Sequence, residues 1–190
     1  MSEQQSGSPA KKILVLPIGD DIGPDILEII AANIQTNLSL PVDVLDSIPL
    51  PSEPYSPQRG QYNALAFLKI LQSMERSDGA KLLGVVKVDL FIPIFTYVFG
   101  EAQLGQSCAV ISLWRLWRMN DGSRSSLPLY FERAAKLAVH ELAHTFNLSH
   151  CDNANCILKY MPDLDTLDAQ DLLFCHYCDL DLKESIDSWR

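Results

Sequence analysis

The sequence predicts an α/β fold, and three observations support this prediction. Short apolar runs rich in Val, Ile and Leu, beginning with residues 13–16, have the length and composition of buried strands. Longer segments carry apolar residues at every third or fourth position, as amphipathic helices do. The two kinds of segment alternate along a chain of 190 residues, a length that suits one domain with a single core.

The first half of the chain is expected to alternate between strands and helices. Pro24 stands where the first turn of a helix tolerates proline, and isoleucines recur behind it at helical spacing. Four prolines within residues 49–60 predict an irregular loop. The expected elements are a buried strand at 13–16, a helix at 24–38, an alternating strand at 41–48 and an amphipathic helix at 62–74.

The second half begins with two strands and ends its periodic part with a helix. The Val-rich run from residue 81 is expected to form a strand to about 90, because Pro93 interrupts any continuation. CAVISLWRL, residues 108–116, has the apolar composition of another strand. Ser125 or Ser126 can cap a helix from 128 to about 146, and no periodicity is evident after residue 150.

Composition limits the partners and the compartment that we expect. The formal net charge of −9 and the pI of about 4.8 give the surface a negative field, which disfavours nucleic acid and membrane surfaces as partners. Residues 1–12 are polar and are expected to form a disordered tail without the apolar core of a signal peptide. We therefore expect a cytoplasmic protein whose thiols stay reduced.

Three of the four histidines lie in the stretch HELAHTFNLSH, residues 140–150. His140 and His144 are four residues apart on the last expected helix, so their imidazoles lie one above the other and can bind one zinc ion. Glu141 between them can act as general base, as in the HExxH motif of zinc peptidases. The third ligand is expected at His150, and three neutral imidazoles leave the fourth zinc position open for water.

His150 can return to the zinc only if the helix ends before it. A helix continued for six residues would carry His150 about 9 Å along the axis from His144. Asn147 stands at the place for a break, because asparagine is the non-glycine residue that most readily adopts the left-handed conformation that ends helices. The pattern matches HExxHxxGxxH with Asn147 in place of the glycine.

Four of the five cysteines follow these histidines as two spaced pairs. Cys151 and Cys156 enclose four residues, and Cys175 and Cys178 enclose two. Four thiolates can form a tetrahedral structural zinc site that supplies folding free energy to a small lobe, so we expect two Zn²⁺ per chain. Because Cys151 directly follows His150, the two sites are expected to be mechanically linked.

The run HExxHxx(G)xxHCxxxxC followed by CxxC resembles the archaemetzincin family, and KKILVLPIG, VDLFIPIFTYVFGEAQ and CAVISLWRL are also similar to it. The resemblance implies a metzincin-like zincin fold, with a mixed twisted sheet, an active-site helix and a small zinc-stabilised C-terminal lobe. It implies a metallopeptidase that hydrolyses peptide bonds by zinc-activated water. The implied site residues are the base Glu141, the catalytic-zinc ligands His140, His144 and His150, and the structural-zinc ligands Cys151, Cys156, Cys175 and Cys178.

The domain boundaries and partners that we expect follow this resemblance. A single catalytic domain is expected over residues 13–190, with an upper lobe at 13–147 and a lower, zinc-containing lobe at 148–190. The expected partner is a peptide or protein substrate, and the expected state is a monomer.

Two finer expectations concern the zinc floor and the substrate. The family usually places a methionine beneath the catalytic zinc, at a position where this chain has Leu158. We favour Leu158 as the apolar residue beneath the zinc, and the alternative is a shifted turn that brings Met161 there.

In metzincins generally, an edge strand of the upper sheet binds extended peptide by strand addition. The run 108–116 is the best candidate, with 112–116 bordering the cleft, and the alternative is that this strand is internal.

Other interpretations of these motifs compete with the zinc peptidase. His140 and His144 can be solvated helix residues, and the cysteines can be buried apolar residues or disulfide partners. The alternative functions are hydrolysis of non-peptide amides and a non-catalytic zinc-binding interaction module. An intact Glu141 argues against the non-catalytic module, because a purely structural site has no use for a base.

Overall fold

A computed structural model of the protein describes residues 11–76, 79–119 and 121–189. Its helices and strands alternate, as the sequence predicts. In chain order they are β1 (Ile13–Ile18), α1 (Pro24–Leu38), β2 (Val42–Val44), β3 (Tyr55–Ser56), β4 (Gln61–Asn63), α2 (Ala64–Ser73), β5 (Lys81–Val86), β6 (Leu90–Phe91), β7 (Gly100–Ala102), β8 (Cys108–Ser112), α3 (Leu127–Thr145), α4 (Leu164–Ala169) and α5 (His176–Trp189).

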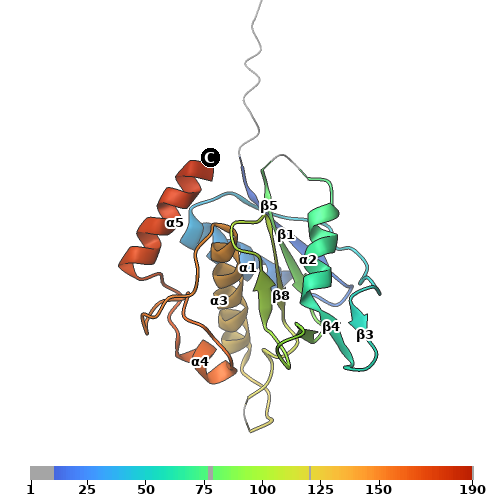
Figure 1. The fold of residues 1–190 in the computed structure, drawn as a ribbon. Helices are drawn as coiled ribbons and strands as arrows, with labels where there is room; N and C mark the ends of the chain where they lie inside the picture. The colour runs from blue at the N-terminus through green and yellow to red at the C-terminus, as the bar shows by residue number, and fades with distance from the viewer. Residues whose placement is uncertain (1–10, 77–78, 120, 190) are drawn as a thin grey trace, which may run out of the picture.

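Five strands form the main sheet, in the order β2-β1-β5-β8-β7. The first four are parallel to one another, and β7 pairs antiparallel with β8 at the edge. A smaller sheet of β3, β4 and β6 lies beside α2 (Figure 1). The sheet is therefore mixed, as the resemblance implies, and β7 is one of its two edge strands, with no strand beyond it in the described part of the chain.

Helices cover both faces of the main sheet, which explains why its strands are continuously apolar. Ile13 and Val15 of β1 point to the face that carries α1 and α3, whereas Leu14 and Leu16 point to the face that carries α2. Figure 1 shows the sheet between these helices. Every residue of β1, β5 and β8 is buried.

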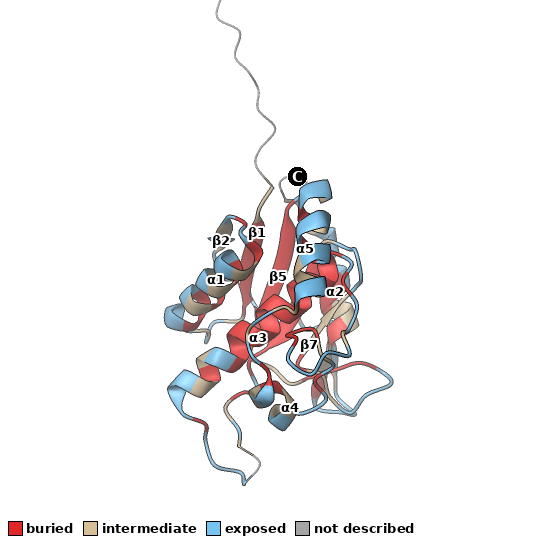
Figure 2. Ribbon diagram, turned by 90° about the vertical axis from the view of Figure 1, so that its left-hand side faces the viewer, coloured by how far each residue is buried: buried red, intermediate tan, exposed pale blue. Residues whose placement is uncertain are grey.

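The helix α3 begins where the sequence predicts and is buried along most of its length (Figure 2). The Ser126 hydroxyl accepts a hydrogen bond from the Leu129 N–H and caps the first turn. Arg133 is 1% exposed; it forms an ion pair with Asp168 and donates to the Leu116 carbonyl. These contacts fix α3 between the sheet and the C-terminal segment.

The C-terminal segment contains two helices that the sequence analysis missed. α4 and α5 lie on the α3 side of the molecule (Figure 1), and Leu182 and Ile186 of α5 join the same core as α1 and α3. The rest of α5 is largely exposed (Figure 2), and more than half of its residues are polar. The apolar residues of α5 do not all lie on a single helical stripe, and only two of its fourteen residues are buried, so the sequence gives too weak a periodicity to predict a helix.

Several strand predictions were too long. The strand expected at 81–90 divides into β5 and β6, and the strand expected at 108–116 ends at Ser112. There the Ser112 hydroxyl accepts a hydrogen bond from the Trp114 N–H, which turns the chain away from the sheet. The disordered tail expected at 1–12 lies outside the described residues, apart from Lys11 and Lys12, and Lys12 pairs with Asp43.

Candidate metal centre and active site

The three histidines of the motif converge on one point. One ring nitrogen of each of His140, His144 and His150 lies within 4.8 Å of the others. The Nδ1 atoms of His140 and His144 lie 2.7 Å from the Ile157 carbonyl and 2.6 Å from the Leu148 carbonyl. An N–H at Nδ1 then donates to each carbonyl and leaves each Nε2 lone pair free for a metal. The donor set fits zinc.

Burial keeps these imidazoles in the neutral form that binds metal. It lowers the pKa of His140 to about 3, with a further contribution from the neighbouring His144. Burial also lowers the pKa of His144 and that of His150. The three rings are thus uncharged at neutral pH, each with a single N–H.

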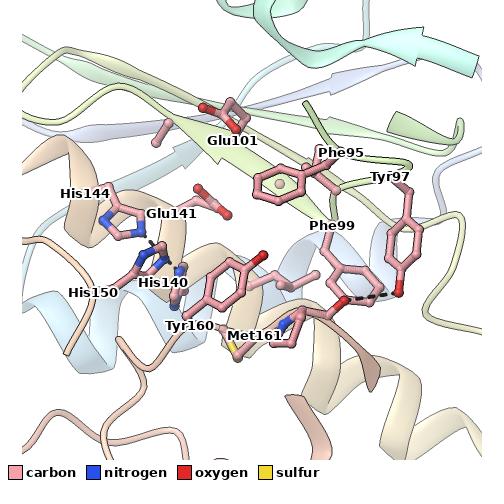
Figure 3. Close-up of a pocket in the computed structure, with 15 residues that line it drawn as sticks. Phe95, Tyr97, Phe99, Glu101, His140, Glu141, His144, His150, Tyr160 and Met161 are labelled. Atoms are coloured by element: carbon pink, nitrogen blue, oxygen red, sulfur yellow. Dashed lines mark hydrogen bonds between the residues drawn. The ribbon is translucent and has the colours of Figure 1, made fainter. Parts of the chain in front are cut away.

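The chain reverses after α3 through a left-handed residue, as predicted. Asn147 has φ of 68°. Its N–H donates to the His144 carbonyl, and the Leu148 N–H donates to the Ala143 carbonyl, which together form a Schellman motif. Because the reversal begins here, His150 returns toward the other two imidazoles (Figure 3).

We predict that Asn147→Gly keeps this turn and Asn147→Val does not. A β-branched residue in left-handed geometry costs about 1–2 kcal/mol or more, and the strain falls on the segment that carries His150. The valine variant should therefore bind zinc more weakly at the histidines, as measured by competition with a chelator. Equal zinc affinity in the two variants would contradict this account.

Lys81 satisfies a carbonyl that the helix break leaves without an intrahelical partner. Its ammonium donates to the Thr145 carbonyl at 2.6 Å and lies 4.4 Å from the centre of the Phe146 ring. Burial lowers the pKa of Lys81 to about 8. The sequence marks Lys81 only as the start of a strand, because Thr145, whose carbonyl it contacts, lies 64 residues further along the chain.

Glu141 projects from α3 into the cavity that the histidines line (Figure 3). It is 7% exposed, and its carboxylate forms no hydrogen bond or ion pair with the described residues. Burial raises its pKa well above the ordinary value, and the charge of Glu101 raises it further. This carboxyl group thus lies beside the imidazoles without a hydrogen-bond partner among the described residues.

Gly100 of β7 makes room for this side chain. A Cβ atom at Gly100 would lie 2.7 Å from both Cγ and Oε1 of Glu141. In the sequence, Gly100 stands out only as part of VDLFIPIFTYVFGEAQ, a stretch similar to the archaemetzincin family. A glycine in a three-residue strand without alternation carries no signal that a strand is present.

We predict that Gly100→Ala displaces the Glu141 carboxylate and lowers peptide hydrolysis by about 10²-fold, the cost expected for a misplacement of about 1 Å. Zinc content should not change, because the histidines do not contact this position. Gly23→Ala is the matched control, since a Cβ there meets no atom within 4 Å. Full activity in Gly100→Ala would show that the base does not depend on this space.

Four aromatic residues, Phe95, Tyr97, Phe99 and Tyr160, contribute to the wall of the cavity, which encloses about 170 Å³. The Tyr97 hydroxyl donates to the Pro162 carbonyl at 3.1 Å, so the segment before β7 touches the segment after the cysteine pair (Figure 3). Arg115 lies 3.9 Å from the centre of the Tyr97 ring and forms a bidentate ion pair with Asp89. These contacts hold one end of the cavity closed.

Leu158 and Met161, the two candidates for the residue beneath the metal position, occupy different places in the structure. Met161 lines the cavity, whereas Leu158 is fully buried in the core and does not line it. The Leu158 carbonyl instead accepts a hydrogen bond from the Cys151 N–H. Leu158 therefore stays the predicted residue beneath the catalytic zinc, with Met161 as the alternative.

The edge strand beside the active-site helix is β7, not the strand expected at 108–116. β8 lies between β5 and β7, so it is internal. Ser112 is 2% exposed, and residues 112–116 do not line the cavity that holds the histidines. The alternative that this run is an internal strand is the correct one. All three residues of β7 line the cavity instead.

The four cysteines of the two spaced pairs form a second cluster. Their four sulfurs lie within 4.8 Å of one another. The Cys151 and Cys175 sulfurs are 3.9 Å apart, which is too far for a disulfide, and all four thiols are free. The Cys178 N–H donates to the Cys175 sulfur and lowers the Cys175 pKa to about 7. The Cys175 N–H donates to the Cys156 sulfur. This donor set fits a tetrahedral zinc site.

The remaining histidine and cysteine lie apart from both clusters. His176 is exposed at the start of α5. Cys108 is fully buried in β8, as expected of a small apolar residue. The clusters found among the described residues are thus the two that the sequence predicts, which argues against solvated histidines or scattered buried cysteines.

An α/β fold with an HExxH helix beneath a free edge strand defines the class of the protein as zinc metallopeptidase. The sequence pattern of peptidase family M54 matches residues 21–184, and the chain belongs to this family. The archaemetzincin of Pyrococcus furiosus is 33% identical over 180 residues, which cover 92% of this chain and 93% of that protein. The archaemetzincin of Methanopyrus kandleri is 37% identical over 129 residues, which cover 68% of this chain and 70% of that one.

Solved structures agree with this assignment. The crystal structure of the Methanopyrus kandleri archaemetzincin matches with a TM-score of 0.82 and 31% identity, covering 96% of this chain and 99% of that chain. The crystal structure of the Archaeoglobus fulgidus archaemetzincin matches with a TM-score of 0.77 and 30% identity, covering 90% of this chain and 99% of that chain. The resemblance to archaemetzincins and the metzincin-like fold are confirmed. Among the described residues, no helix is long and apolar enough to span a bilayer.

Proposed function

We propose that His140, His144 and His150 hold a catalytic zinc and that Glu141 is the general base of peptide hydrolysis. The observation that carries this proposal is the convergence of three imidazoles and one unpaired carboxyl group on a single cavity beneath an edge strand. We further propose that the four-cysteine cluster holds a second, structural zinc, so that the chain binds two ions.

Each group has a defined part in the reaction. Zinc, when bound, supplies Lewis acidity that lowers the pKa of water and polarises the carbonyl, and its charge favours the ionised form of Glu141. The Glu141 carboxylate accepts the proton of the attacking water. The resulting carboxylic acid then donates that proton to the nitrogen of the leaving amine. The aromatic wall excludes bulk water and orients the substrate.

The free edge of β7 is the proposed binding site for the peptide backbone. Among the described residues, β7 pairs with β8 on one side and with no strand on the other, so its outer side offers backbone N–H and carbonyl groups to an extended chain. A peptide strand added there passes over the cavity that contains Glu141. Hydrogen exchange with a bound peptide hydroxamate should protect residues 100–102, and protection restricted to other segments would contradict this placement.

All proposed ligands and the base come from one chain, which supports a monomer with one catalytic domain over residues 13–190. The lower lobe at 148–190 shares the core of the upper lobe at 13–147 through α5, so the two act as one unit. Four thiolate ligands suit a reducing compartment such as the cytoplasm.

Zinc analysis combined with cleavage of a diverse peptide library tests the proposal. We expect close to two zinc ions per chain, and peptide products that disappear when zinc is removed and return when it is restored. Cleavage of simple amides but not peptides would favour the alternative hydrolase. Two bound zinc ions without any hydrolysis would favour the non-catalytic module.

A further inference from the structure

Glu101 lies at the centre of the proposed substrate-binding strand, on the opposite face from Glu141. Glu101 pairs in register with Val110, which belongs to the core on the α2 face, whereas its neighbours Gly100 and Ala102 pair with residues of the α3 face. Figure 3 shows Glu141 between Glu101 and the three histidines in the view drawn. Glu101 thus borders the cavity without being part of the metal site.

The Glu101 carboxylate has no partner among the described residues. Its side chain is partly buried, and it forms neither a hydrogen bond nor an ion pair there. Burial raises its pKa above the ordinary value. The nearest element on this face, α2, meets the segment after β7 through a hydrogen bond between the uncharged side chains of Gln72 and Gln103. A partly desolvated carboxylate is therefore available to a cation from outside the protein.

A peptide strand that adds to β7 brings one side chain to this carboxylate. Side chains alternate between the two faces along an extended chain, so the residue opposite Glu101 projects onto the α2 face. Opposite charges on directly opposed residues of paired strands stabilise the pairing. The neighbouring substrate residues project onto the other face, toward the aromatic wall and the metal-binding imidazoles.

We propose that Glu101 selects peptide substrates that carry a lysine or arginine side chain at the residue paired with it. This inference rests on the proposed peptidase function and on strand addition at β7. Glu101 acts as a specificity residue, and it takes no part in proton transfer. The overall net charge of −9 attracts the same cationic peptides.

The test uses peptide binding, so that it does not depend on turnover. Zinc-loaded Glu141→Gln protein is titrated with N-acetylated peptides in which one lysine is moved through each position of an otherwise neutral sequence. We expect lysine at one position to tighten binding by about tenfold relative to norleucine. Adding Glu101→Gln should reduce this ratio to about one, and adding Glu101→Lys should favour glutamate at the same position.

Glu28→Gln is the matched control, because it removes the same charge from the exposed face of α1. The lysine preference should survive it. A preference that is absent with these N-acetylated peptides, that persists in Glu101→Gln, or that disappears equally in Glu28→Gln would overturn the assignment. Turnover by the protein with Glu141 intact is measured separately. Lysine-selective binding without turnover would contradict the peptidase function and leave Glu101 as the selecting residue.

Discussion

Replacing Glu141 by glutamine is expected to lower the rate of peptide hydrolysis by about 10³-fold while the zinc content stays the same. Glutamine keeps the shape of the side chain in the space beneath Gly100, but it cannot accept a proton from water. The imidazoles do not hydrogen-bond to Glu141, so their geometry should not change. The measurement is kcat on a cleaved library peptide together with metal analysis.

Two further variants separate a catalytic from a structural role. Glu141→Asp retains a carboxylate but withdraws it by one methylene, and it should recover part of the lost rate. Glu28→Gln, on the surface of α1, should have full activity. An active Glu141→Gln enzyme would exclude the assigned base. A variant that loses zinc instead would show that Glu141 supports the metal site rather than the chemistry.

The parts of the site that the sequence predicts are those determined by local geometry. A spacing of four residues on a helix places His140 and His144 together whatever surrounds them. The position of Asn147 predicts the reversal, because few residues adopt φ of 68° without strain. The helix at 24–38 was also predicted with its observed limits, since its buried isoleucines recur at helical spacing.

The parts that the sequence does not predict depend on contacts between distant segments. β7 has three residues and no alternation, and it is a strand only because β8 pairs with it. The same pairing makes β8 an internal strand, so the edge strand is β7 rather than the strand expected at 108–116. Gly100, Glu101 and Tyr97 reach the cavity through this arrangement, and no local pattern marks them.

Met161 and α5 illustrate a second limit, which concerns the C-terminal segment. Polar residues dominate α5, and only Leu182 and Ile186 are buried against the core. The two cysteine pairs come together across this segment, and Met161, which lies between them in sequence, lines the cavity. Spacing predicts which residues bind the metal, but not how the chain between them is folded.

The double variant Cys175→Ser/Cys178→Ser is expected to lose one of two zinc ions and a large part of the stability. Loss of a structural metal belongs to the changes that cost more than about 4 kcal/mol, which corresponds to a decrease in Tm of about 8–16 °C for a chain of this size. The effect should fall short of complete unfolding, because Leu182 and Ile186 still anchor α5 to the core.

The remaining zinc site should also weaken, because Cys151 directly follows His150. Without the cluster, the segment after Asn147 keeps its carbonyl contacts with His140 and His144 but loses the sulfur cluster that begins next to His150, so His150 returns to the zinc less often. Cys108→Ala is the matched control, since this buried thiol lies outside the cluster and should leave both zinc ions in place. Metal analysis and thermal unfolding with and without added zinc are the measurements. A double variant that keeps two zinc ions, or one whose Tm equals that of the unaltered protein, would remove the structural zinc from this account.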